Sequence, residues 1–140
     1  KLSQLVLSKW CGMFICFCFT EAVKNGKVVK VVRKEPVTSM HLSAEPDHQN
    51  LTERHTYEAA EIRIRALDQN DNIVSFYQEP VVLSTEGPIA IIGPEIISLQ
   101  GGMGGTYVRT TGEEGVGILK IKAAQMEEQR ILFEVKNDRK

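Results

Sequence analysis

Charge of one sign, aromatic residues, cysteine and long apolar runs are all scarce in this sequence. Its 17 Lys and Arg nearly balance 18 Asp and Glu, which gives a net charge of −1, and 6% of its residues are aromatic. A nearly neutral chain lacks the basic surface that nucleic acids and anionic membranes attract, so we expect neither as a partner. The longest apolar run, residues 10–19, is about half as long as a bilayer-spanning helix.

The three cysteines, Cys11, Cys16 and Cys18, lie close together in the sequence. An odd, clustered set is not a disulfide framework, and a metal site would need further cysteines that the chain does not have. We therefore predict that they are small apolar filler. The chain opens at Lys1 without a small-residue cleavage site, so we expect no signal peptide and a fragment of a longer protein.

The overall composition is that of a globular protein, with 42% apolar and 25% charged residues, and the length suits one domain. Leu2, Leu5 and Val6 recur at helical spacing ahead of Gly12, which predicts a short helix over residues 1–12. That helix would have little to pack against unless a neighbouring segment were present.

From residue 13 onward the apolar spacing changes to two, which is typical of strands. Residues 14–19 are apolar on both faces, as in a strand that is covered from both sides. Asn25-Gly26 follows, and this pair is the strongest short signal of a hairpin turn. Residues 28–32 then form the returning strand.

Short strands with turn signals about every ten residues follow, and they predict an all-β antiparallel sandwich. The clearest is 60–66, where small and branched apolar residues alternate with charged ones. Further strands are predicted at residues 40–44, 81–85, 89–92, 96–99, 106–110, 117–123 and 131–135. We divide the chain into a helical segment, 1–12, and a sandwich, 13–140, in which 13–36 is an opening hairpin and 37–140 the main body.

One segment has the oxygen-ligand spacing of a calcium loop. Asp68, Asn70 and Asn72 alternate, and Glu79 stands at the twelfth position. Against calcium, the sixth position is Ile73 where a sharp turn needs Gly, and the flanks are strands. The favoured alternative is a polar hairpin loop whose Asp and Asn side chains bond their own backbone.

The remaining motifs predict no reactive centre. The Gly-rich segment 101–105 precedes a strand rather than a helix, so we expect a loop or bulge and no phosphate site. His41, His48 and His55 have no spacing typical of metal ligands. No nucleophile motif occurs. We therefore assign no catalytic, cofactor-binding or metal-binding residue and no cofactor.

Three further features have ordinary explanations. The adjacent glutamates at 113–114 and 127–128 fit solvated turns rather than the separated pair of a glycosidase. Asn50-Leu51-Thr52 fits the glycosylation pattern, which means little without a secretory context. The four scattered aromatic residues that a sugar-stacking platform would use are better explained by core packing or an interdomain contact. They are Trp10, Phe76, Tyr77 and Tyr107.

Several segments resemble known β-sandwich domains. Residues 65–72 resemble the R-A-x-D-x-x-G-N strand and turn of bacterial immunoglobulin-like domains, with Asp71 where relatives often carry Gly. Residues 86–94, the glycines at 101–102 and residues 108–112 resemble the G-P-x-x-I-x-G-P, Gly-rich and V-R-T-T-G segments of the C-terminal sandwich of glycoside hydrolase family 2. Residues 24–30 resemble its K-D-G-K-x-V-K turn, so the resemblance extends from about residue 14 to residue 135.

The resemblance implies an immunoglobulin-like sandwich from a bacterial β-galactosidase-like enzyme that hydrolyses glycosides with retention. The catalytic glutamates of that family lie on a (β/α)₈ barrel, for which this chain has no alternating pattern, so no catalytic residue carries over. The resemblance implies a non-catalytic accessory domain that braces the barrel or the oligomer. Other domains of the parent would be its partners, and the bacterial cytoplasm is favoured over secretion.

Two alternatives to the accessory domain remain open at this stage. The chain also fits an autonomous carbohydrate-binding or invasin-like adhesion module, in which Tyr77 or Tyr107 would hold the glycan. The other alternative is a calcium-stabilised linker domain built on Asp68, Asn70 and Asn72. The apolar surface predicted for residues 2–19 also predicts self-association of the isolated fragment.

Overall fold

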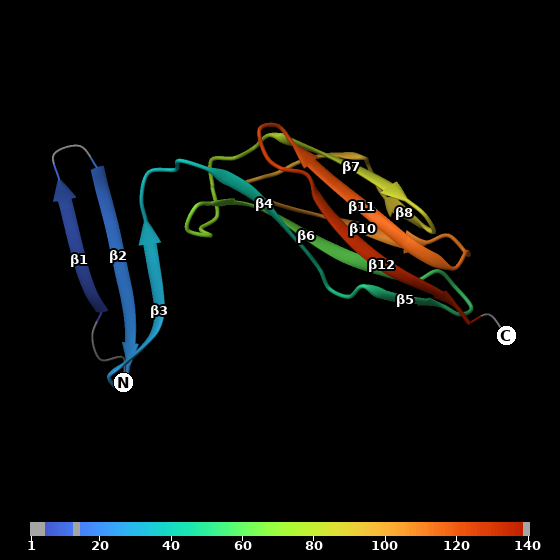
Figure 1. Ribbon diagram of the computed structural model, residues 1–140, viewed down its shortest axis with the longest axis horizontal. Coiled ribbons are helices and arrows are strands. Elements are labelled where there is room, and N and C mark those ends of the chain that lie inside the picture. Colours follow the sequence, from blue (N-terminus) through green and yellow to red (C-terminus); the bar gives the residue numbers. More distant parts are fainter. Residues whose placement is uncertain (1–4, 13–14, 139–140) are drawn as a thin grey trace. The chain divides into compact units, whose positions relative to one another are not determined.

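The computed structural model describes the backbone of residues 5–12 and 15–138, and the side chains of residues 20–138. The chain divides into two compact units. Unit 1 comprises residues 1–39 together with 68–72, and unit 2 comprises 40–67 together with 73–140. All the regular structure in the described part is β (Figure 1).

Unit 1 is built on a three-stranded antiparallel sheet, β1(Leu5–Gly12), β2(Ile15–Lys24) and β3(Lys27–Lys34), in the order β1-β2-β3. The hairpin predicted at Asn25-Gly26 is confirmed. Both residues have positive φ, 53° and 74°, as a type I′ turn requires, and Lys24 pairs with Lys27 across it.

The short helix predicted over residues 1–12 is wrong where the backbone is described, because residues 5–12 form β1. An isolated helix of this length is marginal in water. The alternative gives every residue of β1 a partner, from Leu5 opposite Ala22 to Gly12 opposite Ile15. The pairing with β2 therefore overrides the local helical spacing.

Unit 2 is a sandwich of two sheets, which Figure 1 shows as two layers of strands. One sheet has the order β4-β6-β10-β8, and the other has the order β5-β12-β11-β7-β9. The bounds are β4(Met40–Pro46), β5(Asn50–Glu53), β6(Ala59–Asp68), β7(Pro80–Glu86), β8(Ile89–Ile92), β9(Ile96–Ser98), β10(Met103–Thr110), β11(Gly115–Ala123) and β12(Gln129–Asn137). The predicted all-β sandwich and each of its predicted strands are present.

The core lies between these two sheets and follows the predicted alternation. In β6 every second residue from Ala60 to Ala66 is fully buried, while Arg63 on the opposite face is exposed. In β12 the core side chains are Ile131, Phe133 and Val135. Both sheets supply large apolar side chains to a single cluster, so the core is continuous across the sandwich.

Strand β5 was not predicted, and it alters one edge of the sandwich. It pairs in parallel with β12, from Asn50 opposite Glu134 to Glu53 opposite Asn137. Strand β12 is therefore an inner strand of its sheet, although its Lys and Glu side chains resemble those of an edge strand. Four residues are too few to show a clear period in the sequence.

The Gly-rich segment 101–105 begins as a tight turn at residues 101–102 and continues as the first three residues of β10. Gly101 and Gly102 have φ of 60° and 75°, and a Cβ at Gly102 would lie 2.4 Å from the Val74 carbonyl oxygen. A side chain at this position would collide with backbone. Gly101 and Gly102 are therefore explained by the close packing of this turn, and the predicted loop is confirmed for these two residues, whereas residues 103–105 belong to β10.

Candidate functional site

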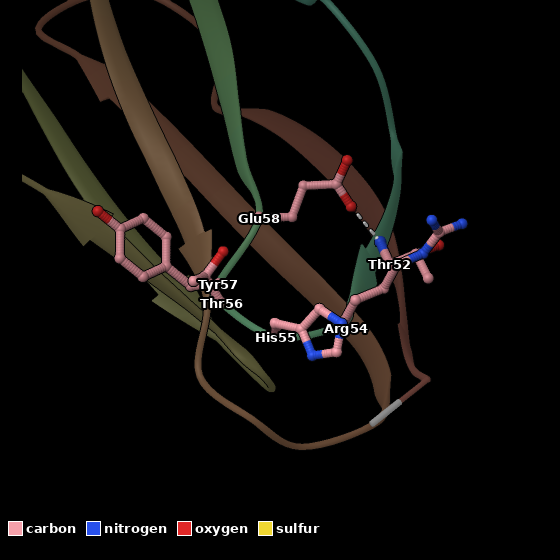
Figure 2. A pocket seen from close by; sticks show the side chains of 6 residues that line it. All are labelled: Thr52, Arg54, His55, Thr56, Tyr57 and Glu58. Carbon is pink, nitrogen blue, oxygen red and sulfur yellow. Dashed lines mark hydrogen bonds between the residues drawn. The ribbon is translucent and has the colours of Figure 1, made fainter. Parts of the chain in front are cut away.

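A pocket of about 480 Å³ lies at the β5–β6 loop. Figure 2 shows its lining, which runs from Thr52 at the end of β5 to Glu58 just before β6. The loop between them is short and polar, and Arg54, His55, Thr56 and Tyr57 are all exposed. We refer to this hollow as the β5–β6 pocket.

Glu58 fixes the shape of the β5–β6 pocket. Its carboxylate accepts a hydrogen bond from the Thr52 backbone N–H, which ties the start of β6 to β5 (Figure 2). Its own backbone N–H donates to Thr110 Oγ1 at 3.1 Å, and its carbonyl accepts from the Thr110 N–H at 3.0 Å. The side chain of Glu58 thus ties the start of β6 to β5, and its backbone ties the start of β6 to the end of β10.

The basic side chains around this pocket are exposed. The Arg109 guanidinium lies 5.5 Å from the centroid of the Tyr57 ring, a cation–π distance. In Figure 2 the Tyr57 ring points away from Thr52 and Arg54, on the far side of the loop from them. Tyr57 therefore lies on one side of the pocket, and Thr52 and Arg54 lie on the other.

A polar turn between β4 and β5 adjoins Glu58. His48 Nδ1 lies 2.9 Å from Asp47 Oδ1, and His48 Nε2 lies 3.7 Å from Glu58 Oε1. Partial burial, which raises the pKa of Asp47, is outweighed by hydrogen bonds from the backbone N–H groups of His48 and Glu61 and by the nearby imidazole. The pKa of Asp47 is consequently below its ordinary value, which keeps this turn anionic.

A second pocket, of about 360 Å³, lies beside the β11–β12 turn. It is lined by Met40, residues 76–79 and residues 124–125, and we call it the Tyr77 pocket. Tyr77 is 5% exposed, and its hydroxyl has no hydrogen-bond partner among the described residues. Burial, and then the Glu79 carboxylate, raise the pKa of Tyr77, so the hydroxyl keeps its proton.

Each of these pockets contains a single carboxylate, Glu58 in one and Glu79 in the other. Hydrolysis of a glycoside by the usual mechanism needs two carboxyl groups on either side of the scissile bond. Glu58 is in addition already bonded to backbone. Neither pocket therefore has, among its lining residues, the pair of carboxyl groups that this mechanism uses.

The segment with calcium-loop spacing is a self-bonded turn. Asp68 Oδ1 accepts from the backbone N–H groups of Asn70 and Asn72 at 2.8 and 2.9 Å, and the Asn72 amide donates to Asp68 Oδ2 at 3.1 Å. The same Asn72 amide donates to the Arg33 carbonyl at 2.7 Å. This is the polar hairpin loop that the sequence favoured. Glu79, the fourth ligand of the calcium pattern, lines the Tyr77 pocket.

The other predicted positions are dispersed. His41 is exposed on β4, His48 bonds Asp47, and His55 lines the β5–β6 pocket. No group of three His, Cys, Asp or Glu side chains with metal-binding geometry occurs among residues 20–138. Cys11, Cys16 and Cys18 lie on β1 and β2. The side chains of these cysteines, and that of Trp10, fall outside the described residues.

The aromatic residues divide between core and surface. Tyr77 belongs to the core, as the packing explanation predicted, whereas Tyr107 and Phe76 are 51% and 68% exposed. The sequence reasoning missed Arg54, Tyr57 and Glu58. Nothing in their spacing singled them out, because a five-residue polar loop between strands has no period.

The comparisons with known proteins agree with this architecture. No family model matches the chain. A curated β-galactosidase from Rhizobium radiobacter is 36% identical over 120 residues, which span 80% of this chain and 87% of that protein. The chain belongs to the bacterial β-galactosidase-like family. The resemblance noted from the sequence is thereby confirmed.

Solved structures of larger enzymes share the fold of this β-galactosidase-like chain. A β-glycosidase from Bacteroides vulgatus superposes with a TM-score of 0.71, and a glycosyl hydrolase family 2 member from Bacteroides cellulosilyticus with 0.70. Each is 16% identical, and the match covers 86% of this chain and 17% of the enzyme. The chain thus spans a small part of the solved glycosidases that it resembles. Among its described residues there is no helix long and apolar enough to cross a membrane.

Proposed function

We propose that this chain is a non-catalytic, immunoglobulin-like accessory domain of a family 2 glycoside hydrolase. The parent enzyme would hydrolyse O-glycosidic bonds in the manner of a β-galactosidase. The observation that carries the proposal is coverage: the chain matches 17% of each solved glycosidase, while most of it, 86%, takes part in the match. That relationship is expected of one domain out of several.

The pockets support the non-catalytic role. Neither the β5–β6 pocket nor the Tyr77 pocket holds the carboxylate pair that glycoside hydrolysis requires. In this proposal residues 37–140 are the sandwich proper and residues 13–36 its opening hairpin. The domain braces the catalytic barrel or the oligomer, and its partners are the other domains of the parent.

The test is turnover by the purified chain. We expect the 140 residues to hydrolyse neither 4-nitrophenyl β-galactoside nor the corresponding glucuronide. Activity that survives stringent purification, and that disappears in Glu58→Gln or Glu79→Gln, would contradict the proposal. Sequencing the DNA upstream of the codon for Lys1 provides a positive test of the proposal. We expect it to encode a barrel with paired glutamates.

The accessory role also makes a prediction about the isolated chain. Large apolar side chains are exposed on the sandwich, Val116 and Leu132 among them, and on β3. We expect such surfaces to bind an apolar dye and to promote self-association. Light scattering that shows a monomer, together with no dye binding, would count against a domain whose apolar surface is covered by the rest of a larger enzyme.

A further inference from the structure

We infer that the Tyr77 pocket is a binding site for a neutral saccharide. This inference goes beyond the accessory role, which assigns no ligand to the chain. It starts from the lining of the pocket, which combines a strongly exposed aromatic ring, Phe76, with the amide side chains of Gln78 and Gln125.

The lining of the Tyr77 pocket determines the class of ligand. Gln78 and Gln125 carry amides that both donate and accept hydrogen bonds, and Glu79 carries an acceptor. The lining includes no basic side chain, so nothing in it would neutralise an anion, and the Glu79 charge would repel one. Donors and acceptors without a cation suit a polyhydroxyl compound that is uncharged.

Phe76 provides the apolar surface that sugar recognition also needs. Its side chain lines the pocket and is 68% exposed, more than any other large apolar residue described. The apolar face of a sugar ring can stack on such an aromatic ring while its hydroxyls bond the amides. Met40 and Ala124 add further apolar contacts. A volume of about 360 Å³ is within the range of small-ligand sites.

Gln125 supports the same assignment through its backbone. It has a φ of 64°, in the left-handed region where Gly or Asn would be less strained. A long amide side chain is thus held at a turn position where it costs stability and where it lines the Tyr77 pocket. A ligand-binding role would explain why this side chain is present at that position.

The experiment is a titration of the full chain, followed by backbone amide resonances in solution. The probes are methyl β-galactoside, methyl β-glucoside and cellobiose, with galacturonate as the charged counterpart. We expect at least one neutral probe to shift the resonances of residues 76–79 and 124–125, and galacturonate to bind more weakly. If no neutral probe shifts them up to its solubility limit, or if galacturonate binds equally well, the inference is wrong.

Substitutions locate the site. Phe76→Ala removes an exposed ring without opening the core, and should weaken binding about ten-fold. The matched control is Tyr107→Ala, an exposed tyrosine on β10, which should leave the affinity unchanged. An equal loss with Tyr107→Ala would place the sugar elsewhere and overturn the assignment.

A charge variant tests the selectivity. Glu79→Gln keeps the hydrogen-bonding shape but removes the negative charge, so galacturonate binding should improve roughly five-fold. No improvement would contradict the electrostatic argument. Failure of these tests leaves the accessory role intact, because that role is tested by turnover of aryl glycosides and by the flanking gene rather than by sugar binding.

Discussion

Strands β3 and β12 are similar in composition but have different surroundings. Both combine branched or aromatic apolar residues with charged ones over eight or nine residues. The apolar residues of β3 are two valine pairs between cations, whereas β12 has Ile131, Phe133 and Val135 at every second position. In β12 Ile131, Phe133 and Val135 are buried, with Phe133 fully inaccessible, whereas Leu132 on the opposite face is exposed. In β3 the valines 28, 29 and 31 are about half exposed or more, and the cationic side chains around them are exposed too.

The comparison separates what a strand sequence specifies from what its neighbours supply. The alternation in β12 is satisfied by a second sheet that covers one face, and the buried area stabilises the sandwich. In unit 1 the local chemistry of the Asn25-Gly26 turn and the backbone ladder with β2 set the register of β3. We therefore expect the two units to respond very differently to equivalent substitutions.

The largest contrast is expected between Phe133→Ala and Val29→Ala. Truncating Phe133 opens a cavity in the core and should lower the free energy of unfolding by about 3–5 kcal/mol. Truncating the exposed Val29 should change it by less than about 0.5 kcal/mol. Urea unfolding followed by circular dichroism measures both. Equal effects would mean that β3 is as well packed as β12, and would abolish the distinction.

Two glycines with nearly the same backbone conformation give the next contrast. Gly102 in the sandwich and Gly26 in the hairpin have φ of 75° and 74°. A Cβ at Gly102 would meet Val74 backbone, whereas at Gly26 no atom lies within 4 Å. Gly102→Ala should therefore cost about 3 kcal/mol and Gly26→Ala about 1 kcal/mol, in the same urea titration. A Gly26 variant that is the more damaging of the two would refute this reasoning.

A smaller and more local effect is expected from Asn72→Ala. The Asn72 amide donates to the Arg33 carbonyl within unit 1, and its loss should cost about 1 kcal/mol there. Hydrogen exchange should accelerate about five-fold near Arg33 while the amides of β6 and β12 stay protected. Asn70→Ala is the control, because Asn70 reaches Asp68 through its backbone N–H. Faster exchange throughout the sandwich would show that the two units unfold together.

The smallest expected change is a gain in stability. Asp71 has a φ of 60° in unit 1, and Gln125 has a φ of 64° in unit 2. Asp tolerates the left-handed region better than Gln, so Asp71→Gly should stabilise by about 0.5 kcal/mol and Gln125→Gly by about 1 kcal/mol. Thermal unfolding would reveal both gains. Destabilisation in either case would show that the side chain makes contacts that outweigh the backbone strain.

The sandwich was largely predictable because its strands carry the alternation that a two-sheet core imposes. Residues 60–66 and 131–135 bury the side chains that their period indicates. The type I′ turn at Asn25-Gly26 was predictable for a different reason, since two positive φ values select these residue types. Strand β1 was not predictable, because its strand pairing is supplied by β2 rather than by its own spacing.

The candidate sites were less accessible to sequence reasoning. The polar loop at Asp68 was anticipated, because Asp and Asn bond their own backbone over short distances. The two pockets were not, since the β5–β6 pocket lies on one short polar loop without a period and the Tyr77 pocket combines residues from separate elements. In the Tyr77 pocket, residues 76–79 meet a turn at 124–125 only after the chain has passed through five further strands. The resemblance at Asp71 gains a physical explanation, as a position with positive φ suits the Gly that relatives often carry.

The parallel pairing of β5 with β12 has a consequence for biosynthesis. Leu51 lies opposite Val135, so the ladder of β5 is completed only after a segment 84 residues further along the chain has been synthesised. Such distant pairing is slow to form, because the loss of chain entropy precedes the gain from contacts. During translation, the first part of the sandwich must therefore wait for its final strand, with the backbone groups of β5 open to chaperones or to water until that strand arrives.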